Sequence, residues 1–202
     1  LKSVTRMLVE NIGYLYTQTF AEHFGRSDVL KELHKFDPKI KRAIDYGVKG
    51  MADGMIRFLE RGRIETIEQL KDYCYHVAGR IGGEVLNSIV EIKDKYQDGR
   101  LIEMPKDLAE KLGTFLQLVN IIKNTRSDWE EGRVFIPGEI RPEGISHEEI
   151  LIGKGIGAEN ARKEVLEKMI SLAEENIHDA ISYMKIIPAH LTGYKTFCIV
   201  PF

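Results

Sequence analysis

The sequence lacks a large excess of charge of either sign. Its 202 residues include 29 Lys and Arg against 31 Asp and Glu, which gives a formal net charge of −2 at pH 7. Proteins that bind nucleic acid through its phosphates usually carry a basic excess. The composition therefore gives no reason to expect a nucleic-acid partner.

Cysteine and long apolar runs are also scarce. The two cysteines, Cys74 and Cys198, are too few for a disulfide framework, and this usage fits a reducing compartment such as the cytoplasm. No apolar run reaches the ~20 residues that a membrane-spanning helix needs, and no signal-peptide pattern stands at the start. We therefore expect a cytoplasmic protein whose contact with a membrane, if there is one, is peripheral.

The sequence is rich in apolar residues at helical spacing. Apart from Val134–Ile136, no segment shows the alternation typical of a strand. Helix-start signals stand at Asp37-Pro38, at Thr66 with Gln69, and at Ser146 with Glu149. We predict helices over about residues 1–24, 29–36, 38–61, 66–96, 105–128, 158–174 and 177–187, with a last one from 190. The fold class is therefore all-α, with residues 1–202 as a single domain.

The stretch from Gly113 to Pro137 combines an apolar helix with a polar stripe. Large apolar residues cover most of the circumference of its first half, so we expect that helix to be buried on nearly all sides. Its polar residues recur at steps of three, four and four, and so share one helix face. They are Gln117, Asn120, Asn124 and Asp128. Because buried polar groups need partners, the stripe faces either a wet cavity or a bound ion; the alternative is a frayed helix end in solvent.

The helix before this stretch has a slim face. Tyr73 and Val77 lie one turn apart, and Ala78 and Gly82 keep the adjacent surface narrow. Such a face fits the wall of a channel for a long apolar ligand; the alternative is a helix–helix contact. In the helix before that, three glycines on neighbouring turns indicate the close approach of another helix or of a ligand, since glycine costs stability in a helix interior. These are Gly47, Gly50 and Gly54.

A long connection over residues 129–147 follows the polar stripe. It is broken by glycines and prolines, and it includes the exposed-type residues Glu130 and Glu131. Loops of this length inside a compact domain are often functional. Because it lies beside the stripe, we expect a lid or flap.

Three stretches match one known family in the family's own order. Residues 117–137 read QLVNIIKNTRSDWEEGRVFIP, residues 73–83 read YCYHVAGRIGG, and residues 197–201 read FCIVP. The first resembles the second aspartate-rich segment of the squalene/phytoene synthase family, roughly Q-x-x-N-I-I-R-D-x-x-x-D followed by G-R and I/L-P. The others are similar to the family's Y-C-x-x-V-A-G-x-V-G and F-C-x-x-P. Together they are far more specific than any one alone.

The resemblance implies a fold and a reaction. The fold is an isoprenoid-synthase-type helical bundle with a central apolar cavity, of which this chain would hold the middle and C-terminal part. The reaction is the head-to-head condensation of two isoprenyl diphosphates, farnesyl or geranylgeranyl, with Mg²⁺. Magnesium would neutralise the diphosphate leaving group, and an apolar cavity would keep the resulting carbocation from water.

The resemblance also implies roles for particular residues. Asp128 matches the last aspartate of the metal-binding segment, whereas Asn124 stands where the family has its first aspartate and brings no charge to a metal. Arg133 matches an arginine that contacts diphosphate, Lys123 stands where arginine is common, and Tyr73 matches the tyrosine that steers the cation or its proton loss. The expected catalytic residues are Tyr73 and Asp128, and the expected metal ligands are Asn124 and Asp128. The expected substrate-binding residues are Gln117, Asn120, Lys123, Arg133, Val77, Ala78 and Gly82.

Alternatives stay open at this point. The family's first aspartate-rich segment, D-x-x-E-D, and its S-R-x-F segment would lie upstream of Leu1, so this sequence looks like part of a longer protein or like a degenerate relative. A non-catalytic protein that binds prenyl diphosphate, a partner subunit of an active relative and a plain helical scaffold are the other readings. A peripheral membrane contact and a homo- or hetero-oligomer are compatible with each of them.

Overall fold

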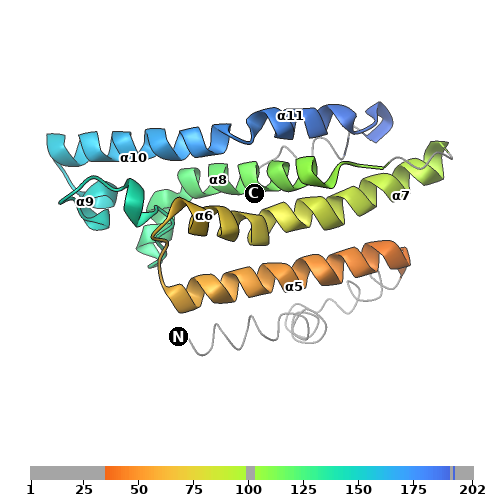
Figure 1. Ribbon diagram of the computed structural model, residues 1–202, viewed down its shortest axis with the longest axis horizontal. Coiled ribbons are helices and arrows are strands. Elements are labelled where there is room, and N and C mark those ends of the chain that lie inside the picture. Colours follow the sequence, from red (N-terminus) through yellow and green to blue (C-terminus); the bar gives the residue numbers. More distant parts are fainter. Residues whose placement is uncertain (1–34, 99–102, 192, 194–202) are drawn as a thin grey trace.

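The computed structural model describes residues 35–98, 103–191 and 193, and every regular element within these ranges is helical (Figure 1). The prediction of an all-α fold is confirmed. The elements are α5 (Pro38–Arg61), α6 (Ile67–Cys74), η1 (Tyr75–Gly79), η2 (Gly82–Leu86), α7 (Asn87–Asp98), α8 (Lys106–Glu130), η3 (Gly138–Ile140), α9 (His147–Ile152), α10 (Ile156–Glu174), α11 (Ile177–Ile186) and η4 (Ala189–Leu191).

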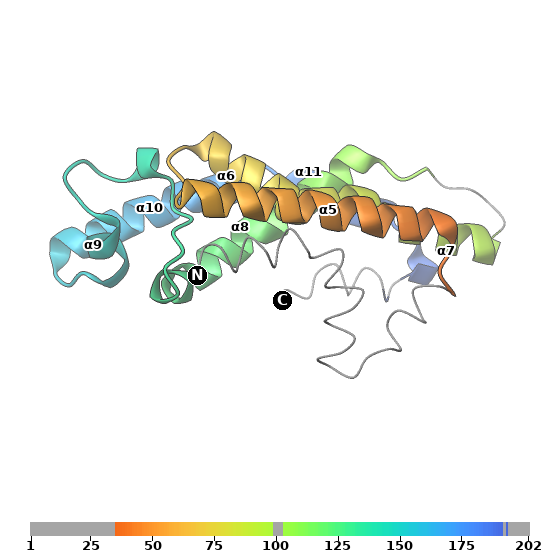
Figure 2. The ribbon, with the colours of Figure 1, turned by 90° about the horizontal axis from the view of Figure 1, so that it is seen from below.

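Helix α8 runs through the middle of the bundle. It contacts η1 and η2 on one side and α10 and α11 on another, while α5 packs on the far side of η1 and η2 (Figure 1). Both views place α9 and the start of α10 at one end of the molecule (Figures 1 and 2). The segment that carries Tyr73 and the helix that carries the polar stripe are therefore direct neighbours.

The predicted helix starts are present as hydrogen-bonded caps. The Asp37 side chain accepts a bond from the Lys39 N–H at 2.7 Å at the start of α5. Complete capping boxes, in which each side chain satisfies a backbone N–H of the first turn, form at the starts of α6 and α9. They pair Thr66 with Gln69 and Ser146 with Glu149.

The helix predicted over residues 66–96 extends from Ile67 to Asp98 but is not uniform. Two of its stretches, η1 and η2, are π-helical. Such bulges are uncommon and are frequent at functional sites. This wider winding includes Ala78, Gly79, Gly82 and Gly83 and lies at the contact with α8.

Glycines let α8 and the η1–η2 segment approach until their backbones nearly touch. A Cβ atom built on Gly113 would lie 2.3 Å from the Ala78 carbonyl oxygen, and one on Gly82 would lie 2.4 Å from the Ala109 carbonyl oxygen. Neither space can hold a side chain, because the obstructing atoms are backbone. The crossing therefore depends on glycine at both positions.

The glycines of α5 also mark a helix contact, one of the two alternatives that their spacing indicated. A Cβ on Gly54 would meet the His76 Cβ at 2.4 Å, and one on Gly50 would meet the Arg80 side chain at 2.3 Å. The guanidinium of Arg80 in turn lies 3.7 Å above the centre of the Tyr46 ring. These contacts hold α5 against η1.

The connection after α8 is packed, so the expectation of a lid or flap is wrong for residues 135–140. Phe135, Ile136 and Pro137 are buried, and Ile140 joins the same core cluster. The backbone N–H of Gly138 donates to the Ile64 carbonyl at 3.1 Å, which ties the loop to the turn before α6. Buried apolar side chains and satisfied backbone groups hold this loop in place.

Three other expectations concern the burial of α8, the two ends of the chain and membrane-spanning helices. The central helix is less enclosed than predicted, because Val119 keeps 37% of its surface exposed. The helix predicted over residues 1–24, most of that over 29–36 and the FCIVP stretch lie outside the described residues. None of the helices in the described part of the chain is long and apolar enough to span a membrane.

The glycine crossing predicts an asymmetric response to added methyl groups. We expect Gly113→Ala to lower the free energy of unfolding by about 1–3 kcal/mol or more, because the new Cβ has no room beside the Ala78 carbonyl. Gly157, in the first turn of α10, has nothing within 4 Å of the same position. Gly157→Ala should be neutral or stabilising by up to ~1 kcal/mol. Urea denaturation of the full-length variants measures both; equal losses would contradict the crossing.

Candidate functional site

The polar stripe of α8 is half-buried along its whole length. Gln117, Asn120, Asn124 and Asp128 all have intermediate exposure. The Asn124 side-chain N–H donates to the Asn120 Oδ1 at 2.9 Å, so neighbouring members of the stripe bond to one another. Because α8 continues to Glu130 and the Asp128 side chain is only 13% exposed, the stripe is not a frayed helix end.

The stripe ends in an ion pair between Asp128 and Arg133. The Nη2 and Nε atoms of Arg133 both donate to the Asp128 Oδ1, at 2.7 and 3.2 Å. The Arg133 N–H also donates to the Asp128 carbonyl at 2.8 Å, and its Nη1 lies 2.5 Å from a Glu131 oxygen. The hydrogen bond to Asp128 is the main cause that raises the pKa of Arg133. This geometry places one fixed cation beside one fixed carboxylate at the helix end.

An aromatic cluster lies beside this ion pair. The Tyr73 ring lies 5.0 Å from both Phe58 and Phe135, and the two phenylalanines stack at 4.7 Å. The three rings come from α5, α6 and the connection after α8. Burial raises the pKa of Tyr73 to about 12, and the charge of Asp128 contributes in the same direction. Tyr73 is therefore a neutral phenol at physiological pH, electrostatically coupled to the ion pair.

The expected channel-wall residues lie farther along the same contact. Val77 packs against the core cluster that contains Tyr73. Ala78 and Gly82 lie at the glycine crossing, where Gly82 faces the Ala109 backbone. For Gly82 the structure therefore has the helix–helix contact that was the alternative to a channel wall. From Ala109 to Asp128 the helix rises roughly 28 Å at ~1.5 Å per residue, so the expected residues follow an elongated path.

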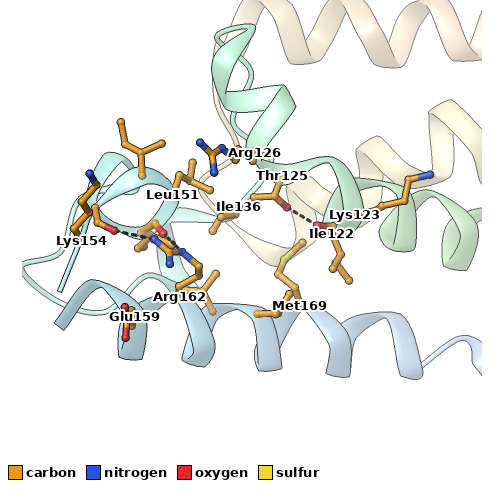
Figure 3. A pocket seen from close by; sticks show the side chains of 15 residues that line it. Ile122, Lys123, Thr125, Arg126, Ile136, Leu151, Lys154, Glu159, Arg162 and Met169 are labelled. Carbon is orange, nitrogen blue, oxygen red and sulfur yellow. Dashed lines mark hydrogen bonds between the residues drawn. The ribbon is translucent and has the colours of Figure 1, made fainter. Parts of the chain in front are cut away.

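Lys123 does not join the stripe. It is exposed and lines a separate pocket of about 580 Å³ between α8, α9 and α10 (Figure 3). Arg126 lines the same pocket and lies roughly 200° around the helix from Asn124. This pocket is therefore on the other side of α8 from the stripe. The role of Lys123 in substrate binding stays a prediction.

Two residues of the site were missed in the sequence. Phe135 lies inside the GRVFIP stretch that resembles the family segment, so an aromatic role could have been inferred there. Nothing in the sequence of α5 singles out Phe58, because its place in the cluster depends on how α5 crosses α6. Both now belong to the candidate site through their ring contacts.

The donor set at the end of the stripe fits magnesium in one particular way. Among the described residues, no group of three or more His, Cys, Asp or Glu side chains is placed to hold a metal ion. Asp128 offers one carboxylate, and Asn124 keeps an amide oxygen because its N–H group is the donor to Asn120. Mg²⁺ commonly binds through one or two carboxylates plus substrate phosphates and waters. The residues fit an ion that shares its coordination with a bound phosphate group.

These features define a helical bundle with a long polar stripe that ends in an aspartate–arginine pair beside buried aromatic rings. The chain belongs to the squalene/phytoene synthase family, whose sequence model matches residues 12–202. The solved structure of TcSQS with the ligand E5700 superposes with a TM-score of 0.70 at 25% identity, over 85% of this chain and 48% of that one.

Curated relatives agree with this membership. Squalene synthase clz20 of Cochliobolus lunatus is 30% identical over 159 residues, which cover 77% of this chain and 38% of the relative. The squalene synthase of Cyberlindnera jadinii is 26% identical over 180 residues, covering 86% and 39%. The chloroplastic phytoene synthase of Daucus carota is 35% identical over 107 residues, covering 52% and 26%. The chain thus spans between about a quarter and two-fifths of the length of these relatives.

The raised pKa of Tyr73 predicts a pH dependence of stability. The pKa lies above its ordinary value of 10.0, at about 12 in the folded protein. The unfolded chain therefore releases this proton first as pH rises. The associated stability is fully present below about pH 10 and is lost towards pH 12, by roughly 2–3 kcal/mol.

Urea unfolding of the wild type and Tyr73→Phe at several pH values measures the contribution of Tyr73 to the free energy of unfolding. Other groups that titrate in the same range contribute equally to both proteins, so the difference between them isolates Tyr73. We expect the wild type to lose stability relative to Tyr73→Phe between pH 10 and pH 12. Parallel curves would show that the Tyr73 hydroxyl is not desolvated.

Proposed function

We propose that the protein to which this chain belongs is a prenyltransferase that condenses two isoprenyl diphosphates head to head, with farnesyl or geranylgeranyl diphosphate as substrate. The observation that carries the proposal is the Asp128–Arg133 pair at the end of a half-buried polar stripe, directly beside the Tyr73 cluster. Family membership supports the reaction class. In this proposal residues 1–202 are the middle and C-terminal part of one catalytic domain.

The diphosphate would bind at the Asp128 end of the stripe. Arg133 has a forked guanidinium that already pairs with the Asp128 and Glu131 carboxylates, and such forks match phosphate oxygens. Asn120 and Gln117 continue the stripe with amide N–H groups that can donate to a diphosphate. These groups would fix the substrate's polar end and leave its chain to run along α8. Lys123 lines the pocket on the other side of α8, so in this proposal it makes no direct contact with the diphosphate.

Asn124 and Asp128 are the residues that would hold magnesium together with the diphosphate. When bound, magnesium neutralises charge on the leaving diphosphate. Asn124 brings no charge of its own, so this chain relies on Asp128 and on the substrate for most of the attraction. We infer weaker metal binding than a site with two carboxylates would have.

The aromatic cluster would shield the reacting carbons. The three rings contact one another. In this proposal their faces would attract a carbocation, and the buried cluster would exclude water from it. The Tyr73 hydroxyl is protonated at physiological pH, and its raised pKa keeps it so even in alkaline solution, so it is available as a hydrogen-bond donor. A neutral phenol beside a diphosphate can orient it without adding a negative charge.

A second candidate function is the binding of prenyl diphosphate without turnover, alone or as the partner of an active relative. The observation in its favour is the pairing of Asn124 with Asn120, which replaces one carboxylate of the stripe by a bonded amide. Both candidates use the same residues for the diphosphate. They differ in whether Asp128, as the one carboxylate of the stripe, binds magnesium well enough for turnover.

Removing the charge of Asp128 distinguishes the proposed site from a purely structural stripe. In the full-length protein we expect Asp128→Asn to lower magnesium-dependent turnover by about a hundredfold or more, since both the metal ligand and the partner of Arg133 are lost. Asp53→Asn, at an exposed position of α5, is the matched control and should keep full activity. Hydrocarbon products are extracted and quantified. Unchanged turnover in Asp128→Asn would refute the metal assignment.

Restoring a carboxylate at position 124 separates the two candidate functions. For an active enzyme, Asn124→Asp should lower the magnesium concentration for half-maximal turnover by about threefold to tenfold, because a second charge joins the site. For a binding protein without turnover, the same change should leave turnover absent or create it. Metal titration of the wild type and Asn124→Asp decides between them. An increased magnesium requirement would contradict the placement of Asn124.

A further inference from the structure

The pocket behind α8 has the size and lining of a ligand site. Its volume of about 580 Å³ lies within the roughly 300–1,000 Å³ of ligand pockets. Apolar side chains from α8, the packed connection and α10 form its inner wall. They include Ile122, Ile136, Val165 and Met169. We call it the α8–α10 pocket (Figure 3).

Its charged lining is mainly cationic. Lys123, Arg126, Lys154 and Arg162 line the pocket, whereas Glu159 is the one acidic residue of the lining. Arg162 donates to the carbonyls of Ile150 at 2.7 Å and Gly153 at 3.0 Å. Within the described ranges its guanidinium is therefore hydrogen-bonded to backbone carbonyls and not paired with a carboxylate. Figure 3 shows this guanidinium between the apolar wall and Lys154. A half-buried cation with only dipolar partners favours an anionic ligand.

The pocket borders the proposed site without belonging to it. Thr125, Ile136 and Leu151 line the α8–α10 pocket and also a small neighbouring cavity that Asp128 and Arg133 line. The polar stripe faces away from it, on the opposite side of α8. A ligand in this pocket would contact Thr125, Ile136 and Leu151, which also line the cavity at the ion pair. It would leave the stripe free for substrate.

We propose that the α8–α10 pocket binds an amphiphile with a single apolar chain and an anionic head group, either carboxylate or phosphate. The chain lies against the wall of Ile122, Ile136 and Met169, and the head group pairs with Lys154 and Arg162 at the rim. Fatty acids and prenyl phosphates share this chemistry. The proposal stands on the pocket alone and does not depend on the proposed function.

Fluorescence titration of the full-length protein with dansyl-labelled undecanoic acid tests the proposal. We expect saturable binding of one probe per chain. Dodecanoate and farnesyl monophosphate compete in separate arms, and the stronger competitor identifies the natural source of the chain. Dodecanol, which has the chain but no charge, should compete about tenfold less well because it lacks the pairing with the cations. Equal competition by dodecanol would overturn the anionic head group.

A matched pair of variants locates the probe. Leu166 and Ile170 both lie on α10 and are 42% and 41% exposed, but of these two only Leu166 lines the pocket. We expect Leu166→Asp to weaken probe binding about tenfold, because it places a carboxylate against the apolar chain, and Ile170→Asp to change it less than twofold. Lys154→Glu should weaken the probe about threefold or more, while Lys185→Glu on α11 should not. Equal effects within each pair would overturn the proposal.

Two further outcomes would also overturn it. If Asp128→Asn abolishes probe binding, the probe occupies the polar stripe and not this pocket. If the wild type binds no probe while Leu166→Asp lowers the melting temperature more than Ile170→Asp does, another part of the protein covers the pocket. Turnover by the wild type is measured in parallel, so failure of the pocket and failure of the proposed function give different results.

Discussion

The close crossing of α8 with the η1–η2 segment determines where the candidate site residues lie. Gly113 and Gly82 leave no space for a Cβ atom, so the two backbones meet directly. This contact fixes the rotation of α8 and so sets the direction of its polar stripe. Tyr73 lies just before the π-helical turns that form the other side of this contact. Larger residues at the crossing would force α8 and the η1–η2 segment apart.

From this crossing the site follows in physical steps. The stripe is half-buried, so its polar groups bond to one another and to Arg133 and not only to water. The connection after α8 brings Arg133 back to Asp128 and Phe135 onto Tyr73, because its apolar residues are buried in the core. One short loop thus supplies both a cation and an aromatic ring. The outcome is an anion-binding end of α8 that adjoins an apolar interior.

Local signals in the sequence predicted a large part of this arrangement. Caps such as Thr66 with Gln69 act within one turn, so the helix starts and the all-α class could be predicted. The shared face of Asn120, Asn124 and Asp128 followed from helical period alone. The π-helical turns, the partner role of Phe58 and the packing of the connection could not be predicted, since each depends on how distant helices cross. The residue roles came from the resemblance, and they await direct tests.

Product analysis of the full-length wild-type protein tests the central claim most directly. Farnesyl and geranylgeranyl diphosphate are supplied separately, with and without magnesium, and the extracted hydrocarbons are identified by mass spectrometry. The account predicts a hydrocarbon of twice the substrate's chain length, from one of the two substrates, only when magnesium is present. Saturable substrate binding without any such product would contradict the assignment as a synthase and favour a binding role.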